Sequence, residues 1–139
     1  MLRQQVALGV GTLMIKLEDI EDCNFFTGVP DSLLKPFIDE ILSSEHQHVV
    51  ATNEGQSIGI AVGAELAGKK ACVYLQNSGI GNVINAITSL CIPHQIYPLL
   101  IIGHRHSLPQ HEVMGEVGEK LLYQIGYNNY IMVKGDNNV

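Results

Sequence analysis

The segment Lys70-Ala-Cys-Val-Tyr-Leu-Gln-Asn-Ser-Gly-Ile-Gly-Asn82 decides the fold. Its first half, residues 70–75, is almost entirely apolar, which is typical of a β-strand that is covered on both faces of a parallel sheet. Its second half, residues 76–82, is rich in amides and glycines, and a helix is predicted from there to about Leu90. A buried strand, a glycine-rich turn and a helix in direct succession indicate one unit of an α/β domain.

The same order of elements recurs on both sides of this segment. Further strands are predicted at residues 24–27, 48–51, 97–102 and 130–133, and further helices at residues 33–42, 54–67 and from about Glu112. A first helix is predicted from an apolar stripe made of Val6, Val10, Leu13, Met14, Leu17 and Ile20. We therefore expect a single α/β domain over residues 1–139, doubly wound, with a mainly parallel sheet and helices on both faces.

Charge and cysteine content narrow the classes of partner. Eight Lys and Arg against 14 Asp and Glu give a formal net charge of −6, and no basic run offsets it, so nucleic acid and anionic lipid are not attracted. No stretch approaches the roughly 18 apolar residues of a membrane span. The three cysteines are widely spaced and odd in number, which fits a reducing compartment. We expect a cytoplasmic protein that acts on a small molecule and has neither a nucleic-acid nor a membrane partner.

Four polar or glycine-rich loops are predicted at one edge of the sheet. In parallel sheets ligands bind beyond the carboxyl ends of the strands, because those ends meet at the same edge. The loops at residues 28–32, 53–55, 76–82 and 103–111 each follow a predicted strand. The sequence therefore predicts a ligand site where these four loops converge.

Glu54 is the first candidate for chemistry at this edge. It stands at the start of a predicted helix, where an acid is favoured by the helix dipole alone. However, Gly55, Gly59 and Gly63 follow it, and side chains this small let another helix or a ligand approach closely. A carboxyl at the buried start of such a helix can exchange a proton with a bound ligand. Both interpretations stay open at this stage.

Two other segments are less specific. Residues 76–82 form either a cradle for an anion or another ligand, or merely a tight strand-to-helix turn, and they lack the lysine of a P-loop and the third glycine of a dinucleotide motif. His104, His106 and His111 could bind zinc, could belong to a solvated loop, or could include His111 as a hydrogen-bonding or proton-donating residue for a substrate.

Four strings in one order carry a family resemblance: Phe26-Thr-Gly-Val-Pro-Asp-Ser-Leu-Leu34, Asn53-Glu-Gly55, Gly63-Ala-Glu-Leu-Ala-Gly-Lys69 and Gln76-Asn-Ser-Gly-Ile-Gly-Asn82. They resemble the pyrimidine-binding domain of thiamine diphosphate enzymes, specifically the phosphonopyruvate and sulfopyruvate decarboxylases, over about residues 25–122. The first string and Asn53 resemble the phosphonopyruvate enzyme more, whereas Met114-Gly115 resembles the sulfopyruvate enzyme. Where the family usually has Gly-Trp-Arg-Gly, this sequence has Gly103-His-Arg-His106. The differences from the family therefore lie in the loop on the substrate side.

The resemblance implies an α subunit of a split phosphonopyruvate decarboxylase, which converts 3-phosphonopyruvate to phosphonoacetaldehyde and CO2. One alternative is a sulfopyruvate decarboxylase α subunit, which converts sulfopyruvate to sulfoacetaldehyde and CO2. Another is a noncatalytic regulatory module that binds a nucleotide or zinc at the same edge of the sheet. The implied cofactors are thiamine diphosphate and Mg²⁺.

The resemblance also assigns residues. Glu54 would share a proton with the pyrimidine ring, and Asp31 and His111 are candidates for protonating the reacting carbon and orienting the substrate. The implied cofactor-binding residues are Glu54, Asn77, Ser78, Gly79, Gly81 and Asn82. The implied substrate-binding residues are Asp31, Ser32, Arg105 and His111, with Arg105 suited to an anionic substrate group.

No residue of this chain is expected to ligate the metal. The family holds Mg²⁺ and the diphosphate with a Gly-Asp-Gly motif that is followed by a helix and an Asn, and here Gly135-Asp-Asn-Asn138 stands at the end of the sequence. We therefore expect a β subunit that carries the diphosphate- and Mg²⁺-binding domain, in a hetero-oligomer.

Overall fold

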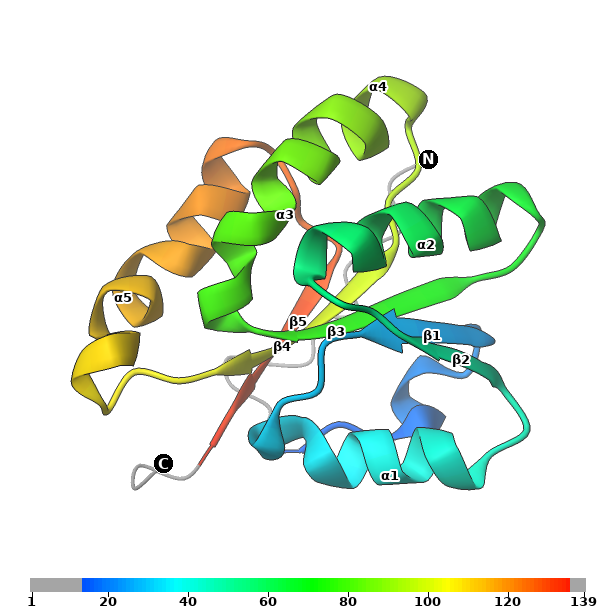
Figure 1. Ribbon diagram of the computed structural model, residues 1–139, viewed down its shortest axis with the longest axis horizontal. Coiled ribbons are helices and arrows are strands. Elements are labelled where there is room, and N and C mark those ends of the chain that lie inside the picture. Colours follow the sequence, from blue (N-terminus) through cyan, green and yellow to red (C-terminus); the bar gives the residue numbers. More distant parts are fainter. Residues whose placement is uncertain (1–13, 136–139) are drawn as a thin grey trace.

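The computed structural model describes residues 14–135, and its centre is a five-stranded sheet in the order β2-β1-β3-β4-β5 (Figure 1). All neighbouring strands are parallel. The strands are β1 (Phe25–Gly28), β2 (Gln47–Val50), β3 (Ala71–Gln76), β4 (Leu99–His104) and β5 (Tyr130–Lys134). The predicted strands and the predicted parallel α/β class are confirmed.

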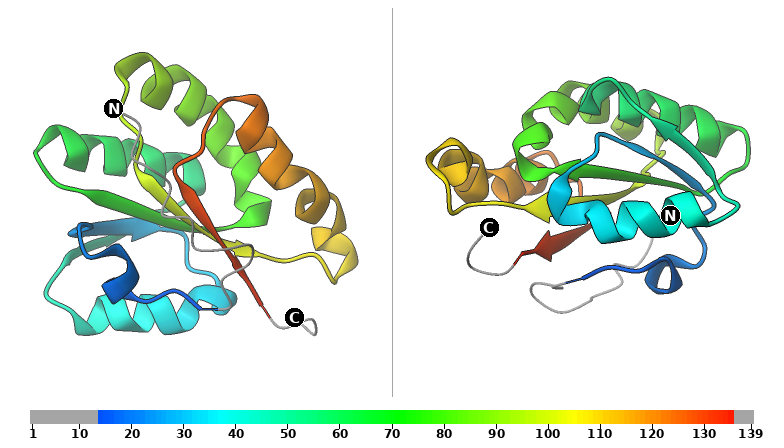
Figure 2. Two further views of the ribbon diagram at one scale, coloured as in Figure 1. Left: turned by 180° about the vertical axis from the view of Figure 1, so that it is seen from behind. Right: turned by 60° about the horizontal axis from the view of Figure 1, so that its bottom comes forward.

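Helices cover both faces of the sheet (Figures 1 and 2). One face carries three short elements: the 3-10 turns η1 (Leu17–Ile20) and η2 (Ser32–Leu34) and helix α1 (Lys35–Ser43). The other face carries α2 (Glu54–Leu66), η3 (Asn77–Gly79), α3 (Ile80–Ala86), the π-helical turn η4 (Ile87–Cys91), α4 (Ile92–His94) and α5 (Pro109–Gln124). This two-sided cover is the doubly wound arrangement that the sequence predicted.

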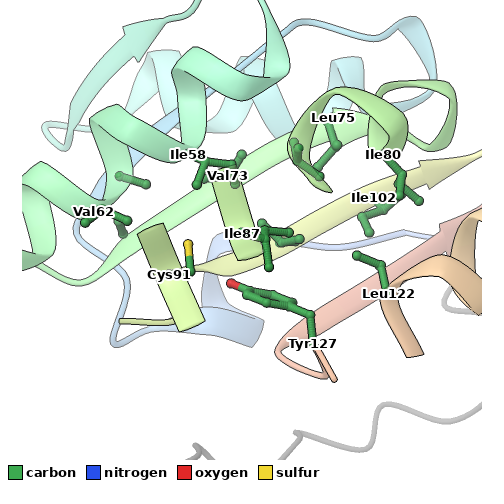
Figure 3. Close-up of a cluster of buried hydrophobic side chains, with 14 of the residues drawn as sticks. Ile58, Val62, Val73, Leu75, Ile80, Ile87, Cys91, Ile102, Leu122 and Tyr127 are labelled. Carbon is green, nitrogen blue, oxygen red and sulfur yellow. The ribbon is translucent and has the colours of Figure 1, made fainter. Parts of the chain in front are cut away.

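Two hydrophobic clusters, one on each face, hold the layers together. Val73 and Leu75 of β3 pack under α2 and α3 in the larger cluster (Figure 3). The intervening residues Cys72 and Tyr74 belong to the cluster under α1. Because side chains alternate along a strand, β3 is buried on both faces, and this explains its unbroken apolar sequence.

Over the described residues from Met14 onward, the prediction of a long N-terminal helix is wrong. Val6, Val10 and Leu13 lie outside the described residues. Over the next residues, only the turn η1 is helical, and Met14 to Lys16 are not. The Leu17 N–H donates to Glu40 Oε2 of α1 at 3.1 Å, and the Lys16 N–H donates to Asp19 Oδ2 at 2.9 Å. These side-chain bonds and the burial of Ile15 and Ile20 determine the path of the chain, which apolar spacing alone does not reveal.

Two helix boundaries also differ from prediction. The helical segment after β3 continues past Leu90 to His94, with the wide η4 turn just before Pro93, whose missing N–H interrupts the regular hydrogen-bond pattern. Helix α5 begins at Pro109, inside the predicted polar loop, because proline suits the first turn of a helix. His111 is consequently a helical residue.

The parallel register brings the four predicted loops to one edge. Gly28 at the end of β1 pairs with Val50 and with Tyr74, and Gln76 at the end of β3 pairs with Gly103. The segments that follow β1, β2, β3 and β4 therefore start side by side at the carboxyl edge, called the rim below.

Across residues 14–135, none of the helices has both the length and the apolar character needed to cross a bilayer.

The two-sided burial of the sheet predicts a large cost for truncating a core residue. Leu100 in β4 is fully buried, whereas Leu66 at the end of α2 is 74% exposed. We expect Leu100→Ala to lower the free energy of unfolding by about 2–5 kcal/mol, because it removes packed atoms and leaves a cavity. Leu66→Ala is the matched control and should change it by less than about 0.5 kcal/mol. Urea unfolding of the purified chain measures both, and equal losses would contradict this description of the core.

Candidate active site

Glu54 is held at the rim between helix α2 and the loop that follows β3. It is the first residue of α2, after the N-cap Asn53, whose side-chain oxygen accepts from the Gln56 N–H at 2.9 Å. The Glu54 Oε2 accepts from Asn82 Nδ2 at 2.8 Å. Glu54 is half-buried, and its bond to Asn82 adds to the favourable helix dipole.

Glycines make this close approach possible. A Cβ on Gly79 would lie 2.6 Å from Glu54 Oε1, and a Cβ on Gly55 would lie 2.9 Å from the Asn82 carbonyl oxygen. Both distances are shorter than a real Cβ contact. The glycine-rich segment after β3 is therefore more than a tight turn, because the missing side chain at Gly79 is the space that the Glu54 carboxyl occupies.

A second group of rim residues surrounds a buried ion pair between Asp31 and Arg105. The Arg105 Nε donates to Asp31 Oδ1 at 3.1 Å, and Nη2 lies 3.1 Å from the same oxygen. The Arg105 Nη2 also donates to Ser32 Oγ at 2.5 Å. The side chains of Arg105 and Asp31 are 10% and 4% exposed. The structure thus brings together three of the four predicted substrate residues, but the guanidinium bonds to its own chain.

The second oxygen of Asp31 has no such partner. Asp31 Oδ2 is buried, has no hydrogen-bond partner among the described residues, and would lie 2.7 Å from a Cβ on Gly103. A cavity of about 250 Å³ opens beside the residue and is lined by Pro30, Asp31, Ser32, Lys35 and Ile38. Leaving a buried oxygen unpaired costs free energy, so such groups often have a chemical role.

Asn77 ties two rim loops together. Its Nδ2 donates to the Arg105 carbonyl oxygen at 2.8 Å, and its Oδ1 accepts from the Arg105 N–H at 3.1 Å. The residue is 1% exposed, so the amide of this predicted cofactor residue is directed into the protein. Ser78, by contrast, is exposed, and a Cβ on Gly81 would meet nothing within 4 Å. The surface that this segment offers to a ligand is therefore made by Ser78, Gly81 and Asn82.

The three histidines of the β4–α5 region do not form a common site. His104 hydrogen-bonds to the Gly115 carbonyl oxygen at 3.0 Å and stacks on His106 at 6.4 Å, and His106 Nε2 lies 3.8 Å from Glu116 Oε1. In residues 14–135 no group of three or more His, Cys, Asp or Glu side chains is arranged to hold a metal ion. His111 lies apart, half-buried in the first turn of α5, and its buried Nδ1 has no hydrogen-bond partner in the described part of the chain.

Three residues outside the predicted site residues also shape the rim: Gln76, Gly103 and Gly115. Gln76 Nε2 donates to Asp31 Oδ1 at 3.0 Å. A Cβ on Gly115 would lie 2.4 Å from His106 Cδ2 and 2.9 Å from the Arg105 carbonyl oxygen, so this glycine lets α5 approach the loop. Gln76 and Gly103 follow directly after two predicted strands, and residues at such positions lie at the rim. Their role could therefore have been predicted from the sequence.

The parallel sheet and the polar groups at its carboxyl edge define an α/β protein with a candidate ligand site at the ends of its strands. No protein-family profile matches the sequence. The sulfopyruvate decarboxylase subunit alpha of Methanocaldococcus jannaschii is 45% identical over 112 residues, which cover 74% of this chain and 65% of that protein. The same subunit of Methanococcus maripaludis is 39% identical over 104 residues, covering 71% and 62%. The phosphonopyruvate decarboxylase of Streptomyces viridochromogenes is 38% identical over 101 residues, covering 68% and 25%.

The chain belongs to the family of sulfopyruvate decarboxylase alpha subunits and phosphonopyruvate decarboxylases. Its five-stranded parallel fold agrees with the pyrimidine-binding domain that the sequence resembles. The chain spans slightly less than two thirds of the alpha subunits that it matches, and about a quarter of the Streptomyces protein.

The buried ion pair predicts a measurable coupling in stability. We expect Asp31→Ala and Arg105→Ala each to lower the free energy of unfolding by about 3–5 kcal/mol, because each leaves one buried group unpaired. The double variant should lose less than the sum of the two. Lys35 and Asp39 form a matched exposed pair, with side chains 70% and 54% exposed, and their coupling should stay below about 1 kcal/mol. Additive losses at Asp31 and Arg105 in urea unfolding would contradict the ion pair.

Proposed function

We propose that this chain is the α subunit of a split, thiamine diphosphate-dependent decarboxylase for a pyruvate that carries an anionic group on its methyl carbon. The phosphonate and the sulfonate are the two substrates of this class named for relatives of the chain. The observation that carries the proposal is the Glu54 carboxyl, held at the rim by Asn82 and lodged against Gly79. The family similarity supports a decarboxylase, and this carboxyl supplies the acid that thiamine chemistry requires.

The residues of the rim fit an aminopyrimidine ring. Glu54 uses Oε2 for its bond to Asn82, and Oε1 lies on the side of Gly79, where no side chain intervenes. Gly81, two residues further along the same segment, has open space where a side chain would stand. We propose that Glu54 binds a ring nitrogen through a shared proton, with Ser78, Gly79, Gly81 and Asn82 along the cofactor. When bound, thiamine diphosphate supplies the carbon nucleophile and the electron sink of the reaction.

The overall reaction needs a proton at the carbon that loses CO2. The bond between the carboxylate carbon and the keto carbon breaks, CO2 leaves, and a proton takes its place to give an aldehyde. Asp31 Oδ2 and His111 Nδ1 are buried and without hydrogen-bond partners in the described part of the chain, which supports both as proton-transfer groups. We propose that they deliver this proton and orient the substrate.

Arg105 contributes positive charge beside Asp31 and Ser32. Its Nε and Nη2 groups make the bonds to its own chain, and Nη1 takes no part in them. A guanidinium has donors only and matches the oxygens of a phosphonate or sulfonate. We propose that Arg105 keeps Asp31 in place and attracts the anionic end of the substrate through Nη1.

A partner subunit completes the proposed enzyme. Three relatives are named as alpha subunits, and in the Streptomyces viridochromogenes enzyme the matching segment is a quarter of a longer chain. Val49 and Val50 on the edge strand β2 and Leu66 on α2 are exposed apolar residues, which suit a subunit contact. We propose a β subunit there that holds the diphosphate and Mg²⁺. The cysteines Cys23, Cys72 and Cys91 are buried, which fits a cytoplasmic enzyme.

The deciding experiment is a decarboxylase assay of the chain after co-expression with a β subunit. CO2 release from phosphonopyruvate and from sulfopyruvate is measured side by side, and the preferred substrate has the higher kcat/KM. We expect Glu54→Gln to lower turnover by at least about a hundredfold, because an amide cannot share the proton. Glu45→Gln, at an exposed position before β2, is the matched control and should keep normal turnover. Near-normal activity of Glu54→Gln would remove Glu54 from the mechanism, and inactivity of the wild-type complex on both substrates would reject the proposed function.

The split site predicts that the cofactor binds weakly to the isolated chain. We expect isothermal titration of the chain with thiamine diphosphate and Mg²⁺ to give little heat, because the charged diphosphate lacks its binding domain. Adding the β subunit should produce tight binding. Stoichiometric, tight binding to the chain alone would contradict a divided cofactor site.

A further inference from the structure

Gln76, the last residue of β3, connects the two halves of the rim. Its Nε2 donates to Asp31 Oδ1 at 3.0 Å, and its Oε1 accepts a hydrogen bond from Ser78 Oγ. The residue is half-buried. One side chain therefore joins the ion pair of Asp31 and Arg105 to exposed Ser78, which directly precedes Gly79 in the sequence.

The ion pair determines which way the Gln76 amide faces. A guanidinium carries hydrogen-bond donors and no acceptor, and Arg105 directs both Nε and Nη2 at Asp31 Oδ1. That oxygen is therefore an acceptor, and the group that Gln76 presents to it must be the NH2. Rotating the amide by half a turn would place two oxygens against each other, so the carbonyl oxygen of Gln76 faces Ser78.

The direction of this bond in turn determines what Ser78 can offer. A serine hydroxyl has a single hydrogen, and here that hydrogen is donated to Gln76. What remains at the exposed side of Ser78 is the pair of oxygen lone pairs. Ser78 is thus an acceptor toward the rim and has no donor to give.

We infer that Gln76 is a positioning residue that fixes Ser78 as a hydrogen-bond acceptor, so that the ligand group received at Ser78 is an N–H or O–H donor. This inference deepens the proposed function and rests on it. An oxygen that can only accept, such as one from a carboxylate, phosphonate or sulfonate, is unfavourable next to Ser78. The anionic end of the substrate is consequently directed away from Ser78, toward the guanidinium side of the rim.

The test is a double-variant cycle in the assembled complex of the chain with its β subunit. We expect Gln76→Met and Ser78→Ala each to lower kcat/KM by about tenfold, the scale of one hydrogen bond. The double variant should lose clearly less than the product of the two single losses, because both changes remove the bond between Gln76 and Ser78. Ser78→Thr keeps the hydroxyl and should stay within about twofold of wild type. Gln47→Met, at the opposite end of β2 and exposed, is the matched control and should be unchanged.

Two outcomes would overturn the inference. One is a double variant whose loss is the product of the single losses, about a hundredfold, which is expected if the residues act independently. The other is a Ser78→Thr variant as poor as Ser78→Ala, which would mean that the hydroxyl is not the group in use.

A second measurement on the full chain separates this inference from the proposed function. If the wild-type complex decarboxylates neither substrate, the proposed function fails, and NMR of the chain alone decides the amide direction. Cross-relaxation between the Gln76 side-chain NH2 protons and the Arg105 Nε proton supports the inference. Cross-relaxation of the NH2 protons with the Ser78 side chain, without contact to Arg105, would overturn it.

Discussion

The rim depends on one interaction, the buried ion pair between Asp31 and Arg105. It joins the loop after β1 to the loop after β4, which lie on strands separated by β3. Taking two charges out of water is expensive, and the cost is offset only when other polar groups satisfy them. Ser32 and Gln76 do this by bonding to the side chains of the pair, and Asn77 holds the Arg105 backbone in place. The loops are consequently held by a shared polar network.

Missing side chains shape the site as much as the polar groups do. Gly79 leaves the space for the Glu54 carboxyl, Gly103 leaves the space for Asp31 Oδ2, and Gly115 lets α5 close onto the Arg105 loop. Each of these glycines meets a neighbour at a distance that a Cβ would not tolerate. Glu54, the proposed acid, and Asp31, a proposed proton-transfer group, therefore pack against glycines of neighbouring elements. This explains why glycines cluster in the segments that carry the candidate site residues.

The segments of the candidate site could be found from the sequence, but the contacts within it could not. Glu54, Asp31, Ser32, Arg105 and His111 all lie on predicted loops or helix starts after strands, and the structure places those segments at one rim. The sequence does not reveal which carboxylate pairs with the Arg105 guanidinium, because Arg105 and Asp31 are 74 positions apart. The inward direction of the Asn77 amide is hidden for the same reason, since its partner is the backbone of Arg105.

By itself, the sequence determined the alternation of strands and helices, the parallel sheet and the edge that carries the candidate site. The elements follow from the short-range periodicity of apolar residues. Crossover connections through helices make the strands parallel, so their carboxyl ends lie at the same edge of the sheet. Only the tertiary structure decided that Met14 to Lys16 are not helical, that Arg105 is bonded to Asp31, and that Gln76 links Asp31 to Ser78. Those outcomes follow from burial and from hydrogen bonds between segments that are distant in the sequence. The local sequence pattern does not determine which polar groups will pair when they are buried away from water.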